Sequence, residues 1–444
     1  MKFINDRKSV KKRRSIVLST GGLSSPPVIM LIIFVVVIIL LSWTSVFLLP
    51  FSYAQQQQQQ QQQQQNTATN SAACISYDST DNIITITCSS ASLTDINNQL
   101  NDDTILDRQQ QQADNGVWLL NAGIIIAEDA ALYINSTDTK WLKIVSDGNN
   151  PNRIAVYGSL KIDSVKITSW NPEINDYAIT DAQGKIPRPF IIVEDEATGT
   201  SDITNSEIAY LGYAAQLKED NYARRSGLAY NGGDGSLIRG NHIHHNMFGF
   251  YSKGVGDIIL EDNLLHDNSV YGFDPHTGTH DMIIRNNTVH DEGHIGIICS
   301  LDCYNITIEG NKVYNNTDVG IMFSRNMSDS VARNNYVHDE TQCIFVSQSH
   351  NNEIYNNTVS DCENGIYLRD ESSNNKIYNN TIINAKSNGI LVNTGAHDNT
   401  FSSNTIINAT KFGINVAPDS NDNNTFENNK LINAKVAGQQ ESIK

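Results

Sequence analysis

The chain has 444 residues, with 31 Lys and Arg against 48 Asp and Glu, which gives a formal net charge of −17. This length suffices for one large or two ordinary domains. The acidic balance argues against a nucleic-acid partner. Ile and Val dominate the 39% of residues that are hydrophobic, and this favours β-structure.

Residues 1–54 have the pattern of a targeting segment. A basic head ends at Arg14, and residues 28–49 are apolar except for Ser42, Thr44 and Ser45. This run is long enough to span a bilayer, so we expect a membrane anchor or a signal sequence. The positive-inside rule then puts the rest of the chain outside the cytoplasm, at the cell surface or in a periplasm-like space.

Residues 55–72 contain an unbroken glutamine tract and small polar residues, which predicts a stalk. Residues 73–235 are expected to form an irregular, β-rich N-terminal part. Short apolar runs predict strands there at 82–87, 118–120, 123–126, 131–134, 142–145 and 154–158. Residues 194–202 are predicted to be a loop.

The six cysteines fall into three neighbouring pairs, Cys74 with Cys88, Cys299 with Cys303, and Cys343 with Cys362. In a chain outside the cytoplasm we expect disulfides, with metal binding as the alternative. The sequence lacks the Cys-x-x-Cys spacing that favours metal.

Residues 236–436 repeat a unit of Asn-x-aliphatic, a polar patch and Gly-aliphatic. The repeat asparagines recur every 22 to 25 residues, at Asn241, Asn263, Asn287, Asn311, Asn335, Asn357, Asn380, Asn404 and Asn429. Short strands at this period predict an all-β parallel β-helix of about nine regular coils. A leucine-rich horseshoe lacks support because the leucine-rich strand is missing. Residues 437–444 are a polar tail.

The repeat also predicts which side chains stack. The asparagines should bond from coil to coil and accept left-handed turns. Corner positions are expected at Gly249, Gly272, Gly296, Gly320, Cys343, Gly365, Gly389 and Gly413. Residues one and three positions after each corner should point inward, and residues two and four positions after it outward.

The outward positions gather unusual side chains on neighbouring coils. Lys253, Asp274 and His276 are predicted to share one face, with Tyr271 just before the corner and Arg325 further along. A cation, a carboxylate, an imidazole and a phenol are the groups needed to invert a sugar carbon beside a carboxylate. His276 suits the base, because an imidazole titrates near working pH. Asp274 would orient His276 and favour its charged form.

Further outward side chains suit a polysaccharide. The predicted binding residues are Tyr251, Phe345 and Tyr367, which can stack on sugar rings, together with Ser300 and Arg369. Lys253 or Arg325 would neutralise the sugar carboxylate, and Tyr271 would act as the acid. We therefore expect an anionic polysaccharide as partner, with no cofactor and no metal.

The segment 271–276, Tyr-Gly-Phe-Asp-Pro-His, resembles a motif of the mannuronan (alginate) C5-epimerases. Segments 167–172, 210–213 and 249–251 resemble the periplasmic, single-domain branch of that family. The resemblance implies a right-handed β-helix that converts mannuronate to guluronate within a polymer. It gives His276 the role of base, Asp274 that of supporting carboxylate and Tyr271 that of candidate acid.

The sequence departs from the family at one place. The periplasmic branch has a catalytic Arg about one coil after the His, and this chain has Leu301 at the matching position. The secreted branch has a catalytic Asp there, and the corresponding residue of this chain is Ser300. Arg325 or Lys253 would then substitute. The calcium-binding repeats of the secreted branch are missing from the sequence.

Three alternatives remain open. A polysaccharide lyase uses the same groups and then eliminates instead of reprotonating. A surface or carbohydrate-binding β-helix without catalytic activity also fits the stalk. A copper-handling protein is the third, because His244, His266, His290 and His338 share one column with Tyr314. A stack of rings along the rod is the favoured explanation of that column, since the carboxylate or thiolate partners of a closed metal site are not evident. The oligomeric state is not indicated by any of these patterns.

Overall fold

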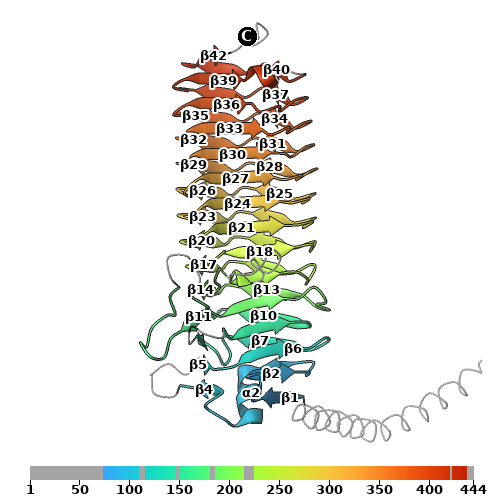
Figure 1. The fold of residues 1–444 in the computed structure, drawn as a ribbon, viewed down its shortest axis with the longest axis vertical. Helices are drawn as coiled ribbons and strands as arrows, with labels where there is room; N and C mark the ends of the chain where they lie inside the picture. The colour runs from blue at the N-terminus through green and yellow to red at the C-terminus, as the bar shows by residue number, and fades with distance from the viewer. Residues whose placement is uncertain are drawn as a thin grey trace, which may run out of the picture. The chain divides into compact units, whose positions relative to one another are not determined.

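A computed structural model describes residues 74–109, 116–146, 148, 151–180, 186–214, 225–420 and 423–437. The described chain forms stacked coils whose strands line up in three long sheets (Figure 1). Pairing between successive coils is parallel along the stack, which confirms the predicted parallel β-helix. The predicted anchor at 28–49, the stalk and residues 438–444 lie outside the described residues. Among the residues that the structure describes, no helix is long and apolar enough to cross a membrane.

Sheet A has 15 strands and carries the motif at 271–276. Its strands in order are β1 (Ile75–Asp78), β2 (Ile83–Ile86), β6 (Gly123–Ile126), β9 (Arg153–Val156), β12 (Phe190–Val193), β15 (Leu228–Tyr230), β18 (Phe250–Lys253), β21 (Tyr271–His276), β24 (Ile295–Ser300), β27 (Val319–Ser324), β30 (Gln342–Ser347), β33 (Asn364–Arg369), β36 (Asn388–Val392), β39 (Phe412–Val416) and β42 (Val436–Ala437).

Sheet B has 13 strands. They are β3 (Ala91–Ser92), β7 (Ala131–Asn135), β10 (Ser159–Asp163), β13 (Ser201–Thr204), β16 (Leu237–Arg239), β19 (Ile259–Glu261), β22 (Ile283–Arg285), β25 (Thr307–Glu309), β28 (Val331–Arg333), β31 (Glu353–Tyr355), β34 (Lys376–Tyr378), β37 (Thr400–Ser402) and β40 (Thr425–Glu427). The loop predicted at 194–202 overlaps the first two residues of strand β13, so its predicted end is two residues too late.

Sheet C has 14 strands, and its last nine follow the nine repeat asparagines. They are β4 (Leu106–Arg108), β5 (Val117–Leu120), β8 (Trp141–Val145), β11 (Lys166–Trp170), β14 (Glu207–Ala209), β17 (His242–His244), β20 (Leu264–His266), β23 (Thr288–His290), β26 (Lys312–Tyr314), β29 (Tyr336–His338), β32 (Thr358–Ser360), β35 (Thr381–Ile383), β38 (Thr405–Ile407) and β41 (Lys430–Ile432).

The N-terminal end of the rod contains a helix that the sequence patterns did not predict. Helix α2 (Leu93–Leu100) begins with a capping box, in which the Ser92 side chain and the Asp95 carboxylate each bond to the other's backbone N–H. It buries Leu93 and Ile96 against the first coils (Figure 1). The signal was present as Ser-x-x-Asp, but the helix is too short for its apolar period to stand out. A short 3₁₀ helix, η3 (Pro418–Ser420), lies near the other end.

The core lies inside the coils, as the repeat predicts. Residues one position after each corner are fully buried, at Phe250, Phe273, Ile297, Ile321, Ile344, Ile366, Ile390 and Ile414. The corner glycines are needed for close packing. A Cβ on Gly272 would lie 2.5 Å from the carbonyl oxygen of Gly296 and 2.6 Å from Val289. The sequence therefore needs glycine there for space and not for an unusual φ.

The repeat asparagines form a continuous ladder that is buried at one corner. Each Oδ1 accepts from the backbone N–H and the Nδ2 of the asparagine one coil before it, as Asn311 does from Asn287 at 2.9 and 3.0 Å. Each Nδ2 also donates to a backbone carbonyl, for example Asn311 to Ile284 at 2.9 Å. The predicted bonding is confirmed. The left-handed φ falls instead on the residue before each asparagine, at 240, 262, 286, 310, 334, 356, 379, 403 and 428.

A second ladder occupies another corner, and it contains two carboxyl groups. It runs through Asn246, Asn268, Glu292, Asn316 and Glu340, with bonds such as Asn316 Nδ2 to Glu340 Oε1 at 2.7 Å. Burial raises the pKa of Glu340 to about 8, against the opposing effect of the Asn316 bonds. A neutral carboxyl therefore replaces an amide in this ladder at neutral pH.

Two of the three expected disulfides form. Cys74 pairs with Cys88, and Cys343 pairs with Cys362. The third expectation was wrong, because Cys299 and Cys303 are buried free thiols in the described chain. Both point into the core from either side of a turn, and Cys303 Sγ donates to the Ser300 carbonyl at 3.1 Å.

We predict that Asn311→Ala lowers the melting temperature of the purified domain. The change removes the buried bonds that Asn311 forms with the backbone N–H and Nδ2 of Asn287 and with the Ile284 carbonyl, and a buried group left unpaired costs about 1–3 kcal/mol. Thr307→Ala, on the half-buried outer surface of the same coil, is the matched control and should leave the midpoint almost unchanged. Equal midpoints for the two variants in thermal unfolding would contradict a stabilising ladder.

Candidate active site

The candidate site occupies four successive coils of sheet A. Lys253 on β18 lies in register with His276 on β21, and His276 with Ser300 on β24. The same column continues to Ser324, Ser347 and Arg369 on β27, β30 and β33. The predicted outward column is confirmed residue by residue, because one coil stacks on the next without a slip.

Arg325 extends back across this column to His276. It follows β27 in a left-handed conformation, with φ of 51°. Its Nη2 donates to Ser300 Oγ at 2.8 Å and to His276 Nε2 at 3.2 Å. A guanidinium can only donate, so Nε2 carries the lone pair and Nδ1 carries the proton. Nδ1 lies 2.5 Å from Thr277 Oγ1, a partner that the sequence patterns missed although it is the next residue.

His276 is neutral in this setting. Burial lowers its pKa to about 4, and the positive charges of Arg325 and Lys253 lower it in the same direction. A neutral imidazole can accept a proton at Nε2 once Arg325 no longer occupies that lone pair. The positive charges near His276 therefore come from Lys253, one coil before it, and from Arg325, two coils after it.

Asp274 has different surroundings from those expected. It lies on the outward side of β21, yet it is only 3% exposed, and its Oδ1 has no hydrogen-bond partner among the described residues. Within the same part of the chain, no hydrogen bond joins it to His276, whose nitrogens bond to Thr277 and Arg325. The expected hydrogen bond between Asp274 and the His276 imidazole is therefore not formed in this structure, and the supporting role of Asp274 stays a prediction. Burial raises the pKa of the carboxyl well above its ordinary range, although Arg325 opposes this.

The two tyrosines of the site occupy different places. Tyr251 lies in register with Asp274, and its ring centroid is 5.8 Å from that of His276. Tyr271 begins β21, five residues before His276, and its ring packs against Phe248 at 5.1 Å and His294 at 5.8 Å. At about 3.3 Å per residue, its backbone is roughly 16 Å from that of His276. The structure thus brings Tyr251 closer to the imidazole than Tyr271.

The remaining predicted residues lie further along sheet A. Phe345 and Tyr367 stack with centroids 5.0 Å apart, and both are half-buried. Tyr367 donates to Asn393 at 3.0 Å, while Arg369 pairs with Asp370 at 2.7 Å. Arg369 is four coils from His276, about 19 Å at 4.8 Å per coil. These side chains can contact a long ligand but not the same sugar as His276.

An apolar cluster lies on the outer surface of sheet A beside the site. It contains Tyr251, Phe248, Met247 and Tyr213, and Phe190 lies beneath them. Tyr251 is enclosed by this cluster and is 5% exposed. The cluster leads up to Lys253 and His276, so one side of the site is apolar and the other is the polar column of serines.

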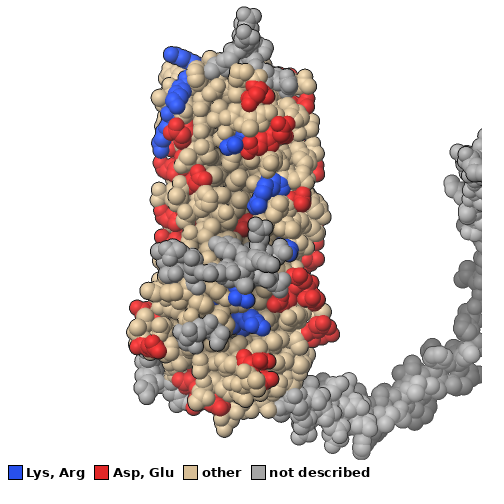
Figure 2. Space-filling view, in the orientation of Figure 1, with Lys and Arg blue, Asp and Glu red and all other residues tan. Residues whose placement is uncertain are grey.

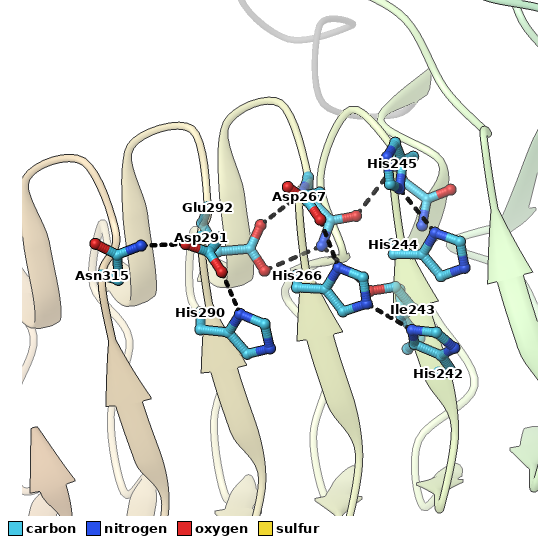
Figure 3. Close-up of polar contacts among 12 residues, drawn as sticks. His242, Ile243, His244, His245, His266, Asp267, His290, Asp291, Glu292 and Asn315 are labelled. Atoms are coloured by element: carbon cyan, nitrogen blue, oxygen red, sulfur yellow. Dashed lines mark hydrogen bonds and ion pairs between the residues drawn. The ribbon is translucent and has the colours of Figure 1, made fainter.

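The predicted histidine column on sheet C is a stack of rings (Figure 3). His244, His266, His290, Tyr314 and His338 follow one another at 4.8 to 5.1 Å between centroids, and Figure 3 shows the first three. His266 and His290 bond through Nδ1 to the aspartate that follows each, at 2.7 and 2.6 Å, and His242 Nε2 lies 2.6 Å from His266 Nε2. Across the residues that the structure describes, no group of three or more His, Cys, Asp or Glu is placed to hold a metal ion.

The charge on one side of the rod is unevenly spread. Figure 2 shows a mostly neutral surface with a run of basic side chains at the upper left, a few basic side chains that stand singly lower down, and acidic side chains both across the face and at its edges.

The chain belongs to the right-handed β-helix family. The family model described as "Right handed beta helix region" matches residues 190–328 and 298–431, which together make up more than half of the chain. The fold class therefore agrees with the expectation from the repeat, and the handedness agrees with what the family resemblance implies.

Part of the chain is similar to curated relatives that share one name. The chain is 30% identical over 174 residues to the mannuronan C5-epimerase of Pseudomonas putida, covering 37% of this chain and 32% of that protein. It is 27% identical over 184 residues to the enzyme of Pseudomonas aeruginosa. The match thus spans about a third of the length of these relatives. The resemblance to mannuronan C5-epimerases is confirmed.

Solved structures show the same fold. The periplasmic alginate epimerase AlgG has a TM-score of 0.70 at 21% identity, covering 79% of this chain and 85% of that one. The A-module of the Azotobacter vinelandii mannuronan C-5 epimerase AlgE6 has a TM-score of 0.52 at 16% identity, covering 73% and 90%. At 21% and 16% identity, these two structures show that the chain shares their fold.

We predict that the pKa of His276 is about 4 and rises toward its ordinary value in Arg325→Gln, because one of the two nearby cations is then lost. The measurement is an NMR titration of the imidazole C–H signals, with His276→Gln to assign the signal. Arg369→Gln, four coils away on the same sheet, is the matched control and should leave the titration unchanged. An equal shift in both Arg variants would mean that no specific contact is involved.

Proposed function

We propose that this protein is a C5-epimerase that converts mannuronate to guluronate residues within a uronate-containing polysaccharide. The observation that carries the proposal is the neutral His276, placed between Lys253 and Arg325 on the outer surface of a β-helix. Relatives and structural neighbours that are named mannuronan or alginate epimerases support it. The whole activity is proposed because these relatives are matched over only part of their length.

The proposed chemistry begins with the uronate carboxylate. Neutralising that group makes the neighbouring C5–H more acidic, and Arg325 or Lys253 can supply the charge. A carboxylate accepts hydrogen bonds more strongly than an imidazole, so its binding would draw Arg325 Nη2 away from His276 Nε2. The freed lone pair can then take the C5 proton. Substrate binding would thus activate the base.

Arg325 is proposed to replace the arginine that the family has about one coil after the histidine. That position holds Leu301 here, but Arg325 reaches Ser300 and His276 from the next coil. Leu301 and Arg325 share one position of the repeat and have similar φ values of 61° and 51°. Movement of the guanidinium by one coil therefore needs no change in the backbone.

An extracytoplasmic location belongs to the same proposal. The basic head, the apolar residues 28–49 and the two disulfides support it, as does the structural likeness to AlgG, which is a periplasmic epimerase. Anchoring by residues 28–49 is the finer part of this proposal. Membrane fractionation of cells expressing the full chain, with and without those residues, tests it.

The deciding experiment incubates mannuronan in D₂O with the purified ectodomain and follows it by NMR. We expect guluronate signals with deuterium at C5 and an intact chain, and we expect His276→Ala to abolish both. An ultraviolet-absorbing unsaturated product would instead identify a lyase. A wild-type protein that leaves the polymer undeuterated would refute the enzyme proposal and favour a surface or carbohydrate-binding role.

We predict that Arg325→Leu lowers the conversion rate by about 100-fold or more, because the charge that stabilises the developing anion is lost. Adding Leu301→Arg in the same chain should restore part of the rate by placing the guanidinium one coil closer to His276. The control is Arg369→Leu with an unaltered residue 301. Failure of the double variant to exceed Arg325→Leu in initial rate would count against the proposed substitution.

A further inference from the structure

We propose that Asp274 is the acid that returns a proton to C5, on the side of the sugar opposite His276, rather than a carboxylate that orients the imidazole. This inference rests on the proposed function and assigns a different role within it. It follows from three features of β21, namely the enclosure of Asp274, its spacing from His276 and the groups that face it.

The enclosure of Asp274 is unusual for a side chain on the outer surface of a sheet. It is 3% exposed, and Oδ1 has no partner among the described residues. An ionised carboxylate without hydrogen bonds is costly to bury, whereas a protonated carboxyl is much less so. The site therefore holds a carboxyl group with its proton still bound and no acceptor among the described residues to take it.

The spacing along β21 suits two groups that act on one carbon. Residues 274 and 276 project from the same side of the strand, two positions apart. At about 3.3 Å per residue, their stems stand roughly 6.6 Å apart. Both side chains extend beyond these stems on the same side of the strand, so their reactive atoms can approach one carbon held between them. A sugar ring standing edge-on between the two residues would present one of its sides to each.

The groups that face Asp274 keep it protonated. Tyr251 from the coil before lies in register with it, and burial is the largest influence on its pKa. The charged or titratable groups nearby are Arg325, which lowers the pKa of Asp274, and the buried thiols Cys299 and Cys303, whose own pKa values are raised. His276 on the same strand is neutral and adds no positive charge. The pKa of Asp274 is raised and that of His276 is lowered, so Asp274 can donate a proton and His276 can accept one.

The proposed step conserves atoms and electrons. His276 Nε2 takes the C5 proton, the C–H pair becomes the C5=C6 bond, and the second negative charge passes to the carboxylate oxygens near Arg325. The Asp274 O–H bond then breaks, and the C5=C6 electrons form a new C5–H bond on the other side. The products are guluronate, an imidazolium and an aspartate, and solvent returns the proton from His276 to Asp274.

Tyr271 is the competing acid, and its position is less suitable. Its ring packs between Phe248 and His294 at the beginning of β21. The strand separates it from His276 by five residues, so it does not share one carbon with that imidazole as readily as Asp274 does. Tyr271→Phe removes the phenol and keeps the ring, so this variant tests the competing assignment.

The test separates removal of the C5 proton from its return. In Asp274→Asn, His276 can still take the proton and give it back on the same side. In D₂O this variant should place deuterium at C5 of mannuronate while guluronate formation falls by about 10²–10⁴-fold. His276→Gln should lose both, whereas a loss of inversion with retained exchange in Tyr271→Phe and not in Asp274→Asn would assign the acid to Tyr271. Near-normal thermal unfolding of Asp274→Asn is also expected, since a neutral amide replaces a neutral carboxyl of the same shape.

A second measurement does not depend on activity. The infrared difference spectrum between the wild type and Asp274→Asn at neutral pH should contain the carbonyl band of a protonated carboxylic acid, because the buried Glu292 and Glu340 contribute equally to both proteins. Loss of both deuterium incorporation and inversion in a folded Asp274→Asn, or the lack of that band, would overturn the acid role and leave the epimerase proposal standing. A wild type without guluronate formation would instead refute the proposed function itself.

Discussion

The interaction on which the structure depends is the hydrogen bonding of one coil to the next, at the backbone and through buried asparagines. A buried amide such as Asn311 bonds to the coil on each side, so any slip of register would leave several polar groups without partners. The ladder therefore fixes each coil against its neighbours. Columns of side chains on the outer surface inherit that registration, which is what a precise site on an open surface needs.

The candidate site uses this registration to combine side chains that are far apart in sequence. Lys253, His276 and Arg325 come from coils that each repeat the same fold, yet together they surround one imidazole with two cations. Burial acts on Asp274 in the same strand with the opposite consequence for charge. A proton acceptor at 276 and a proton donor at 274 thus lie on the same side of one strand without a deep cavity, because the surroundings of the two side chains differ.

A repeating scaffold also explains how a functional group can change its coil. Positions 301 and 325 are equivalent in the repeat, with left-handed backbones of similar φ, so the long side chain of Arg325 serves a site two coils away. The second ladder shows the same tolerance, because Glu292 and Glu340 occupy amide positions as buried carboxyls. Equivalent geometry lets chemistry vary while the coil stays the same.

The sequence determined the period, the inward and outward positions and the column of Lys253, His276 and Ser300, because these follow from a strand period of two and a fixed repeat. It could not reveal that Arg325 extends back to His276, since that depends on the path of a flexible side chain across two coils. Nor could it show that Asp274 is enclosed without a bond to His276, or that Cys299 and Cys303 stay unpaired. Those outcomes depend on packing between coils, which only the tertiary structure decides.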